Sequence, residues 1–192
     1  DVVFASLCHD FGKPEAWAST GNGTNHETMG LPIIEEFCKK WKVPNVYRDL
    51  ALLVCEHHTK IHSCFGRGDN GPVTPKSIMK LFTETNALDK PARFFRILNT
   101  CEADAKGRGG DLSIKPYPQA EYIWDCLTAA NNVNSKEISE KMLKAGKKGT
   151  DIGEAIRVAR IDAIRRVFIS QQTFYNVNKD PVKGSLSIKA IP

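Results

Sequence analysis

The sequence predicts an all-helical fold for these 192 residues. Several long segments repeat apolar residues at the 3.6-residue spacing of helices, and none alternates convincingly between apolar and polar residues as a half-buried strand does. Prolines also mark helix starts, because Thr74-Pro75 and Lys90-Pro91 each place one at the first helical position. Thr74 and Asn134 are the expected N-caps of the helices that follow them. No internal repeat is visible, and a chain of this length with 41% hydrophobic residues can bury one substantial core.

The first predicted helix is short and apolar. It runs through Val2–Cys8 and is followed by Gly12 and Pro14, which together form a helix stop. Its residues are apolar enough to be buried, so we expect a core helix. His9 and Asp10 come directly after it, which places two side chains with metal-binding atoms at the end of that helix.

The remaining predicted helices follow one another along the chain. We expect one domain over 1–175, ending in a helical extension, and an extended or disordered tail over 176–192. Pro32 is expected in the first turn of its helix. The predicted helices cover 28–41, 46–62, 74–84, 91–104, 118–133, a segment from 135 onward and 150–176, with a glycine-rich loop over 65–73.

Two apolar stripes carry histidine or carboxylate side chains. The first includes His57, which is therefore expected in the core, whereas His58 and His62 are i, i+4 partners at one edge of the stripe. The second stripe ends at Asp104, and a carboxylate there must be paired or bound to a cation, because burying it bare is too costly. The apolar stripes are Leu50, Leu53, Val54, His57 and Ile61, and Phe94, Ile97, Cys101 and Asp104.

The histidines are concentrated in one part of the chain, since all five lie between positions 9 and 62. Mixed imidazole and carboxylate ligands suit Mn, Fe, Co, Ni or Zn, with Mg favoured where carboxylates and water dominate. The cysteines form no pair at metal-ligand spacing, which argues against a structural zinc site. The sequence therefore predicts a divalent metal site of histidine and aspartate.

Motifs along the chain resemble one known family. They extend over about 1–164 and are similar to the carboxy-terminal HD domain of bacterial CCA-adding tRNA nucleotidyltransferases. The motifs are His9-Asp10-x-Gly12-Lys13, His26, Val43 to Ala51, Glu56-x-His58-x-x-x-His62, Pro75 to Phe82, Lys90-Pro91, Cys101 to Arg108 and Tyr117-Pro118-Gln119.

The resemblance implies an all-α, HD-domain phosphohydrolase fold that binds a divalent metal such as Ni, Co, Mn or Mg. The activities that it implies are those of a 2',3'-cyclic phosphodiesterase, a 2'-nucleotidase and a phosphatase, serving the repair of tRNA 3' ends. The implied metal ligands are His9, Asp10 and Asp104, with His26 and His58 available to a second metal or to the substrate. The implied phosphate-contacting residues are Lys13, His62 and Arg108, and His58 or His62 would protonate the leaving oxygen.

The sequence departs from the family pattern in two ways. An HD site takes its first histidine from the helix before the His-Asp pair, so that first helix is expected to be missing from a chain that begins at Asp1. The strand-borne paired aspartates of a nucleotidyltransferase head are also not found. We therefore expect the chain to be a piece of a longer protein.

The net charge is +5, and basic side chains are frequent in the final third of the chain. They fit a nucleic-acid surface, but acidic residues lie among them, so a solvated helical face is an equal alternative. The expected partner is a tRNA 3' end or a nucleotide with a 2'- or 2',3'-cyclic phosphate. The alternative function is that of a non-catalytic tRNA-docking or dimerisation module. A dimerisation module would make the protein a homodimer.

Cysteine usage and hydropathy indicate a cytoplasmic protein. The six cysteines are scattered without C-x-x-C spacing, which is typical of free thiols in a reducing compartment. No apolar run approaches the roughly 20 residues that a membrane-spanning helix needs, and no signal-peptide pattern is present. We therefore expect no membrane association.

Overall fold

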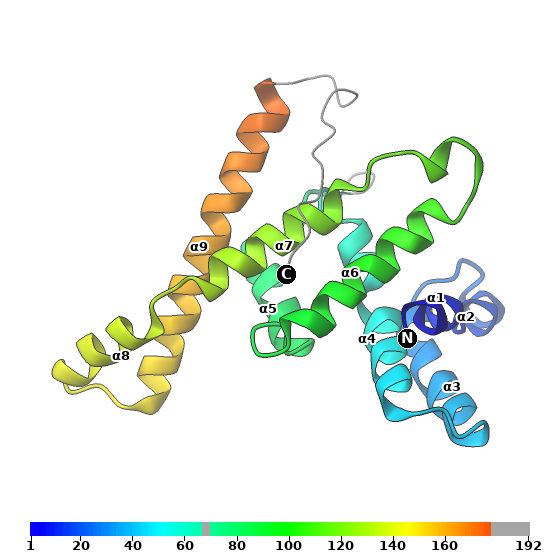
Figure 1. Cartoon of the computed structure of the whole chain (residues 1–192), viewed down its shortest axis with the longest axis horizontal. Helices are drawn as coiled ribbons and strands as arrows, with labels where there is room; N and C mark the ends of the chain where they lie inside the picture. The colour runs from blue at the N-terminus through cyan, green and yellow to red at the C-terminus, as the bar shows by residue number, and fades with distance from the viewer. Residues whose placement is uncertain (67–69, 178–192) are drawn as a thin grey trace. The chain divides into compact units, whose positions relative to one another are not determined.

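A computed structural model describes residues 1–66 and 70–177, with the side chains of 172–177 excepted. The regular elements in this described part are all helices, which confirms the all-helical prediction (Figure 1). In chain order they are α1 Val2–Cys8, α2 Lys13–Thr20, α3 His26–Lys40, α4 Asn45–His62, α5 Pro75–Glu84, α6 Pro91–Lys106, the 3-10 helix η1 Gly110–Ser113, α7 Pro118–Asn131, α8 Ser135–Lys144 and α9 Gly149–Val177.

The chain folds as two compact units that are discontinuous in sequence. Unit 1 contains Asp1–Val73 and Asp89–Ala120, and unit 2 contains Thr74–Leu88 and the residues from Glu121 onward. The expected domain over 1–175 and tail over 176–192 stay predictions, because 178–192 lie outside the described residues.

Helix α4 is the central element of unit 1. It packs against α1, α3 and α6, while α1 also contacts α6 and α2 lies on α3. The predicted stripes face this interior, since Leu50, Val54 and Ile61 of α4 and Phe94 and Ile97 of α6 are almost completely buried. The apolar spacing therefore identified the buried faces of the two helices on which His58 and Asp104 lie.

Helix α1 is buried on one face only. Ala5 and Cys8 are fully buried, whereas Val3 is 83% exposed and Leu7 is 64% exposed. The expectation of a core helix therefore holds for one face of α1 only. His9 and Asp10 follow the buried face at its carboxyl end.

Helix α1 ends at Cys8, ahead of the predicted stop at Gly12 and Pro14, and Pro14 belongs to the next helix. Pro14 lies in the first turn of α2, where a missing N–H leaves no hydrogen bond broken. Gly12 instead allows close packing, because a Cβ there would lie 2.0 Å from the backbone oxygen of His26 and 2.5 Å from the nitrogen of Gly30. This glycine thus brings the segment after Asp10 against the start of α3.

Helix α3 begins two residues before the predicted position. Because His26 is its first residue, Pro32 lies inside the helix and not in its first turn. The earlier start is the change that matters for function, since it places the His26 ring on the first turn of a helix.

Unit 2 is organised around α9, which packs against α5 and α8. The side chain of Thr74 accepts a hydrogen bond from the N–H of Ser77 at 3.3 Å, and that of Asn134 accepts one from the N–H of Glu137 at 3.1 Å. Both predicted helix caps are therefore confirmed. Among the described helices, none combines the length and apolar character that crossing a bilayer requires.

Candidate metal centre

The predicted site residues gather inside unit 1, where the ends of four elements meet. His9 and Asp10 follow α1, His26 opens α3, His58 and His62 lie in the last two turns of α4, and Asp104 lies near the end of α6. The packing of α1 and α3 on α4, and of α4 on α6, brings these positions together.

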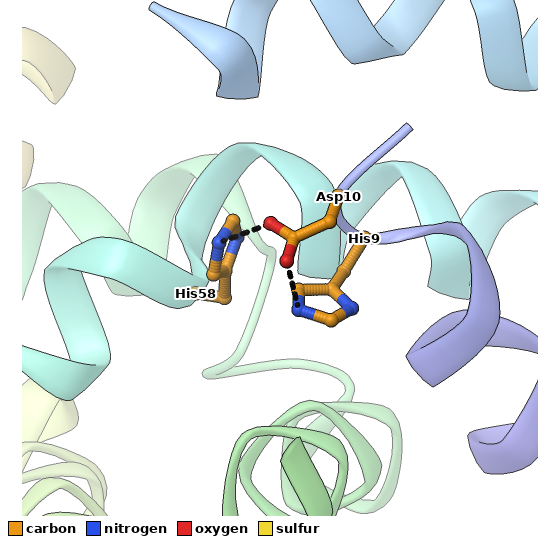
Figure 2. Close-up of side chains that lie close together, drawn as sticks. All are labelled: His9, Asp10 and His58. Atoms are coloured by element: carbon orange, nitrogen blue, oxygen red, sulfur yellow. Dashed lines mark ion pairs between the residues drawn. The ribbon is translucent and has the colours of Figure 1, made fainter. Parts of the chain in front are cut away.

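The Asp10 carboxylate lies between the rings of His9 and His58 (Figure 2). Its Oδ2 atom is 3.2 Å from Nε2 of His9, and its Oδ1 atom is 3.6 Å from Nε2 of His58. Each of the three residues offers a ligand atom within 4.8 Å of the other two. Their arrangement is that of a group able to hold a metal ion.

His26 contacts the same carboxylate from another side. Its Nε2 atom is 3.5 Å from Oδ1 of Asp10 and 3.3 Å from Nε2 of His58. A third imidazole therefore lies beside the group formed by His9, Asp10 and His58.

Backbone carbonyls determine which nitrogen of each ring is protonated. In His9, Nδ1 donates to the carbonyl oxygen of Ser6 at 2.7 Å. In His26, Nδ1 donates to the carbonyl oxygen of Gly23 at 3.0 Å. In His58 it faces the carbonyls of Val54 and Cys55, both at 3.0 Å. A carbonyl can only accept, so Nδ1 carries a proton in each of the three rings. In neutral His26 and His58, Nε2 then keeps a bare lone pair. Nε2 of His9 instead faces the carboxylates of Asp10 and Asp104, and although burial opposes it, the hydrogen bond to Asp10 raises the pKa of His9.

The Nε2 atoms of His26 and His58 face an oxygen of Asp10 that has no hydrogen bond of its own. Oδ1 of Asp10 is buried without a donor. Lone pairs that face one another repel unless a proton or a cation lies between them, as for His26 and His58. The donor set, three imidazole nitrogens and a carboxylate with no thiolate, fits a divalent transition metal.

The protonation states also fit metal binding. Burial lowers the pKa of His58 to about 4, with the neighbouring His9 acting in the same direction. Burial opposes ionisation of Asp10, but hydrogen bonds from His9 and Lys13 outweigh it and hold the pKa of this carboxyl well below its usual range. At neutral pH the aspartate is therefore ionised and His58 is neutral, which are the forms that coordinate metals.

Asp104 extends the cluster on the side of α6. Its Oδ1 atom lies 3.4 Å from Nε2 of His9, and its Oδ2 atom lies 3.1 Å from Nε2 of His62. Asp104 therefore contacts one member of the group of His9, Asp10 and His58 but does not belong to that group.

The two predicted phosphate-binding cations lie at the rim of the cluster. Lys13 Nζ is 2.6 Å from Oδ2 of Asp10, and Arg108 Nη2 is 3.5 Å from Oδ2 of Asp104. Their side chains are 46% and 62% exposed, so both can reach a bound anion.

Sequence reasoning placed His57 in the core, and its 2% exposure confirms this. It placed His58 at one edge of the same stripe, and His58 is also buried, with 4% of its surface exposed. The polar site is itself buried, so hydropathy alone does not separate the two rings. The residue that was missed is Tyr117, whose hydroxyl lies 2.8 Å from Nδ1 of His62; its place just before the helix-opening Pro118 was the available signal.

Comparison with known proteins relates the chain to part of a longer protein. No family model and no solved structure matches the chain. The chain is 41% identical over 167 residues to the multifunctional CCA protein of Pseudoalteromonas atlantica, a match that covers 85% of this chain and 38% of that protein. The resemblance seen in the sequence is thereby confirmed, and the chain is a relative of part of a multifunctional CCA protein.

Proposed function

We propose that this chain is a divalent-metal-dependent phosphohydrolase domain of a tRNA nucleotidyltransferase. Its substrates would be 2'-phosphates and 2',3'-cyclic phosphates of nucleotides or of tRNA 3' ends. The observation that carries the proposal is the convergence of the Nε2 atoms of His9, His26 and His58 on the Asp10 carboxylate. The similarity to a multifunctional CCA protein supports the link to tRNA.

The residues that would hold the metal are His9, Asp10 and His58, with His26 and Asp104 on either side of them. Nickel, cobalt, manganese and magnesium are the ions that we propose, because the ligands are nitrogen and oxygen atoms. A divalent ion there would lower the pKa of a water molecule toward neutrality and polarise a phosphoryl oxygen.

The exposed cations at the rim would bind the substrate. Lys13 and Arg108 each contact a carboxylate of the cluster and remain open to solvent, so they can also contact non-bridging phosphate oxygens. Fixed positive charges in these positions stabilise the negative charge that develops on the phosphorus oxygens during in-line attack.

His58 and His62 were also predicted to protonate the leaving oxygen, and this stays a prediction. Burial lowers the pKa of both rings, so little of either is protonated at neutral pH. The neutral form suits His58 as a metal ligand. It does not suit His62 as the proton donor to the leaving oxygen.

The test is hydrolysis of 2',3'-cyclic AMP by the chain with nickel, cobalt, manganese, magnesium or no added metal, with the products separated by chromatography. We expect turnover only with a metal, and its loss in Asp10→Asn. The matched control is Asp49→Asn, which changes a half-exposed carboxylate paired with Arg48. If protein stripped of metal by a chelator hydrolyses 2',3'-cyclic AMP equally fast with and without added metal, the proposal is refuted.

The same experiment addresses the alternative of a non-catalytic tRNA-docking or dimerisation module. The basic residues of α9 do not favour it by themselves, because Arg157 pairs with Glu154 at 2.6 Å and Arg165 pairs with Asp162. Binding of tRNA without hydrolysis of any tested phosphate under metal-saturated conditions would support the alternative.

A further inference from the structure

We infer that Tyr117 and His62 form a positioning pair that holds the Asp104 carboxylate toward His9 and the candidate metal centre. The inference rests on the proposed function, because it assigns a role to residues beside that same centre.

Tyr117 is placed against the end of α4 by several contacts. Its hydroxyl lies 2.8 Å from Nδ1 of His62, and the two rings meet edge to face with centroids 5.7 Å apart. Gln119, two residues on, directs its amide nitrogen to the backbone oxygen of His62 at 3.4 Å. The segment that enters α7 thus contacts both the ring and the backbone of His62.

The neighbours of His62 determine its tautomer. Oδ2 of the Asp104 carboxylate is 3.1 Å from Nε2, which favours the proton on that nitrogen. Nδ1 is then a bare acceptor, and the phenol of Tyr117, which is protonated at neutral pH, donates to it. His62 therefore carries its proton on the opposite nitrogen from His26 and His58.

This tautomer orients the carboxylate of Asp104. Oδ2 faces His62 and also Arg108, whose Nη2 is 3.5 Å away. The other oxygen, Oδ1, is left 3.4 Å from Nε2 of His9. Outer partners of this kind set the direction and basicity of metal-binding side chains. His62 is thus a positioning residue, and Tyr117 fixes the tautomer that this role needs.

The test compares cobalt binding by the complete chain and by two tyrosine variants. Tyr117→Phe removes the hydroxyl that contacts His62, whereas Tyr47→Phe removes the hydroxyl of a 39% exposed tyrosine that packs on Phe4. We expect Tyr117→Phe to weaken cobalt affinity about 10-fold and to change the visible spectrum of the bound ion. Tyr47→Phe should match the wild type, and thermal unfolding of the metal-free proteins should show that both variants fold.

The outcomes separate this inference from the proposed function. If the wild-type chain binds no cobalt, the proposed function fails and the inference fails with it. If the wild type binds cobalt and Tyr117→Phe binds it equally tightly with an unchanged spectrum, the inference alone is wrong.

A second measurement needs no variant and decides the matter if Tyr117→Phe does not fold. The ring ¹⁵N chemical shifts of metal-free wild-type protein report which nitrogen of each histidine is protonated. We expect Nε2 in His62 and Nδ1 in His26 and His58. Protonation of His62 on Nδ1 would overturn the inference.

Discussion

At the scale of single residues, Asp10 has four charged or imidazole neighbours in the candidate site. Its carboxylate oxygens lie 2.6 Å from Lys13, 3.2 Å from His9, 3.5 Å from His26 and 3.6 Å from His58. The rings are held by hydrogen bonds to backbone carbonyls, so they keep their orientation without Asp10. Loss of this aspartate should therefore remove a ligand without disrupting the geometry of the others.

The first prediction concerns the His-Asp pair. His9→Ala and Asp10→Ala should each abolish metal-dependent hydrolysis and weaken metal affinity by at least about 100-fold, as expected for loss of a ligand. Activity assays and calorimetric metal titrations measure these effects, and circular dichroism checks the fold. A folded variant that keeps most of its activity would show that the pair is not a ligand set.

The second prediction separates the adjacent residues His57 and His58. His57 is 2% exposed and packs in the stripe of α4, so His57→Ala should cost about 1 to 3 kcal/mol of unfolding free energy with metal binding mostly retained. His58→Ala should reduce metal affinity and turnover with the smaller loss of stability, because its Nε2 faces Asp10. Thermal melts and turnover of the two variants decide between them, and exchanged effects would mean that His57 is the ligand.

At the scale of elements, the site depends on how closely helices approach. The start of α3 reaches the segment after Asp10 because Gly12 and Gly30 face each other without side chains. A Cβ on Gly30 would in turn lie 2.6 Å from Sγ of Cys55 in α4. These glycines allow the backbones to meet and thereby bring His26 to the carboxylate.

The third prediction tests this close approach. Gly12→Ala should destabilise the chain by about 3 kcal/mol, since its Cβ would meet backbone atoms of α3 that cannot rotate away. It should also weaken metal binding through displacement of His26. The control is Gly153→Ala in α9, where a Cβ meets nothing within 4 Å and should add about 1 kcal/mol of stability. Denaturant melts measure the change in unfolding free energy for both variants. An unchanged unfolding free energy in Gly12→Ala would contradict the packing argument.

At the scale of the whole molecule, each of the two units has buried apolar side chains of its own. Unit 1 buries Ile34, Leu50 and Phe94, and unit 2 buries Phe82 and Ile164. All six cysteines are buried. The candidate metal ligands are not among these apolar core residues, so we expect the core to persist without a metal.

The fourth prediction follows from this separation of core and site. Chelation should abolish hydrolysis while the helical signal in circular dichroism stays unchanged, and nickel, cobalt or manganese should restore activity better than calcium does. Added metal should raise the unfolding temperature, because it binds the folded state only. Unfolding on chelation would instead identify a structural metal.

The sequence by itself determined the helical class, the caps at Thr74 and Asn134 and the buried stripes of α4 and α6, because apolar periodicity and capping are local properties of the chain. It also indicated His9, Asp10 and Asp104 as candidates. Only the tertiary structure decided which ring nitrogens face Asp10, why α3 can approach that residue, and that Tyr117 contacts His62. These depend on backbone carbonyls and glycine contacts between distant segments, which leave no periodic signal in the sequence.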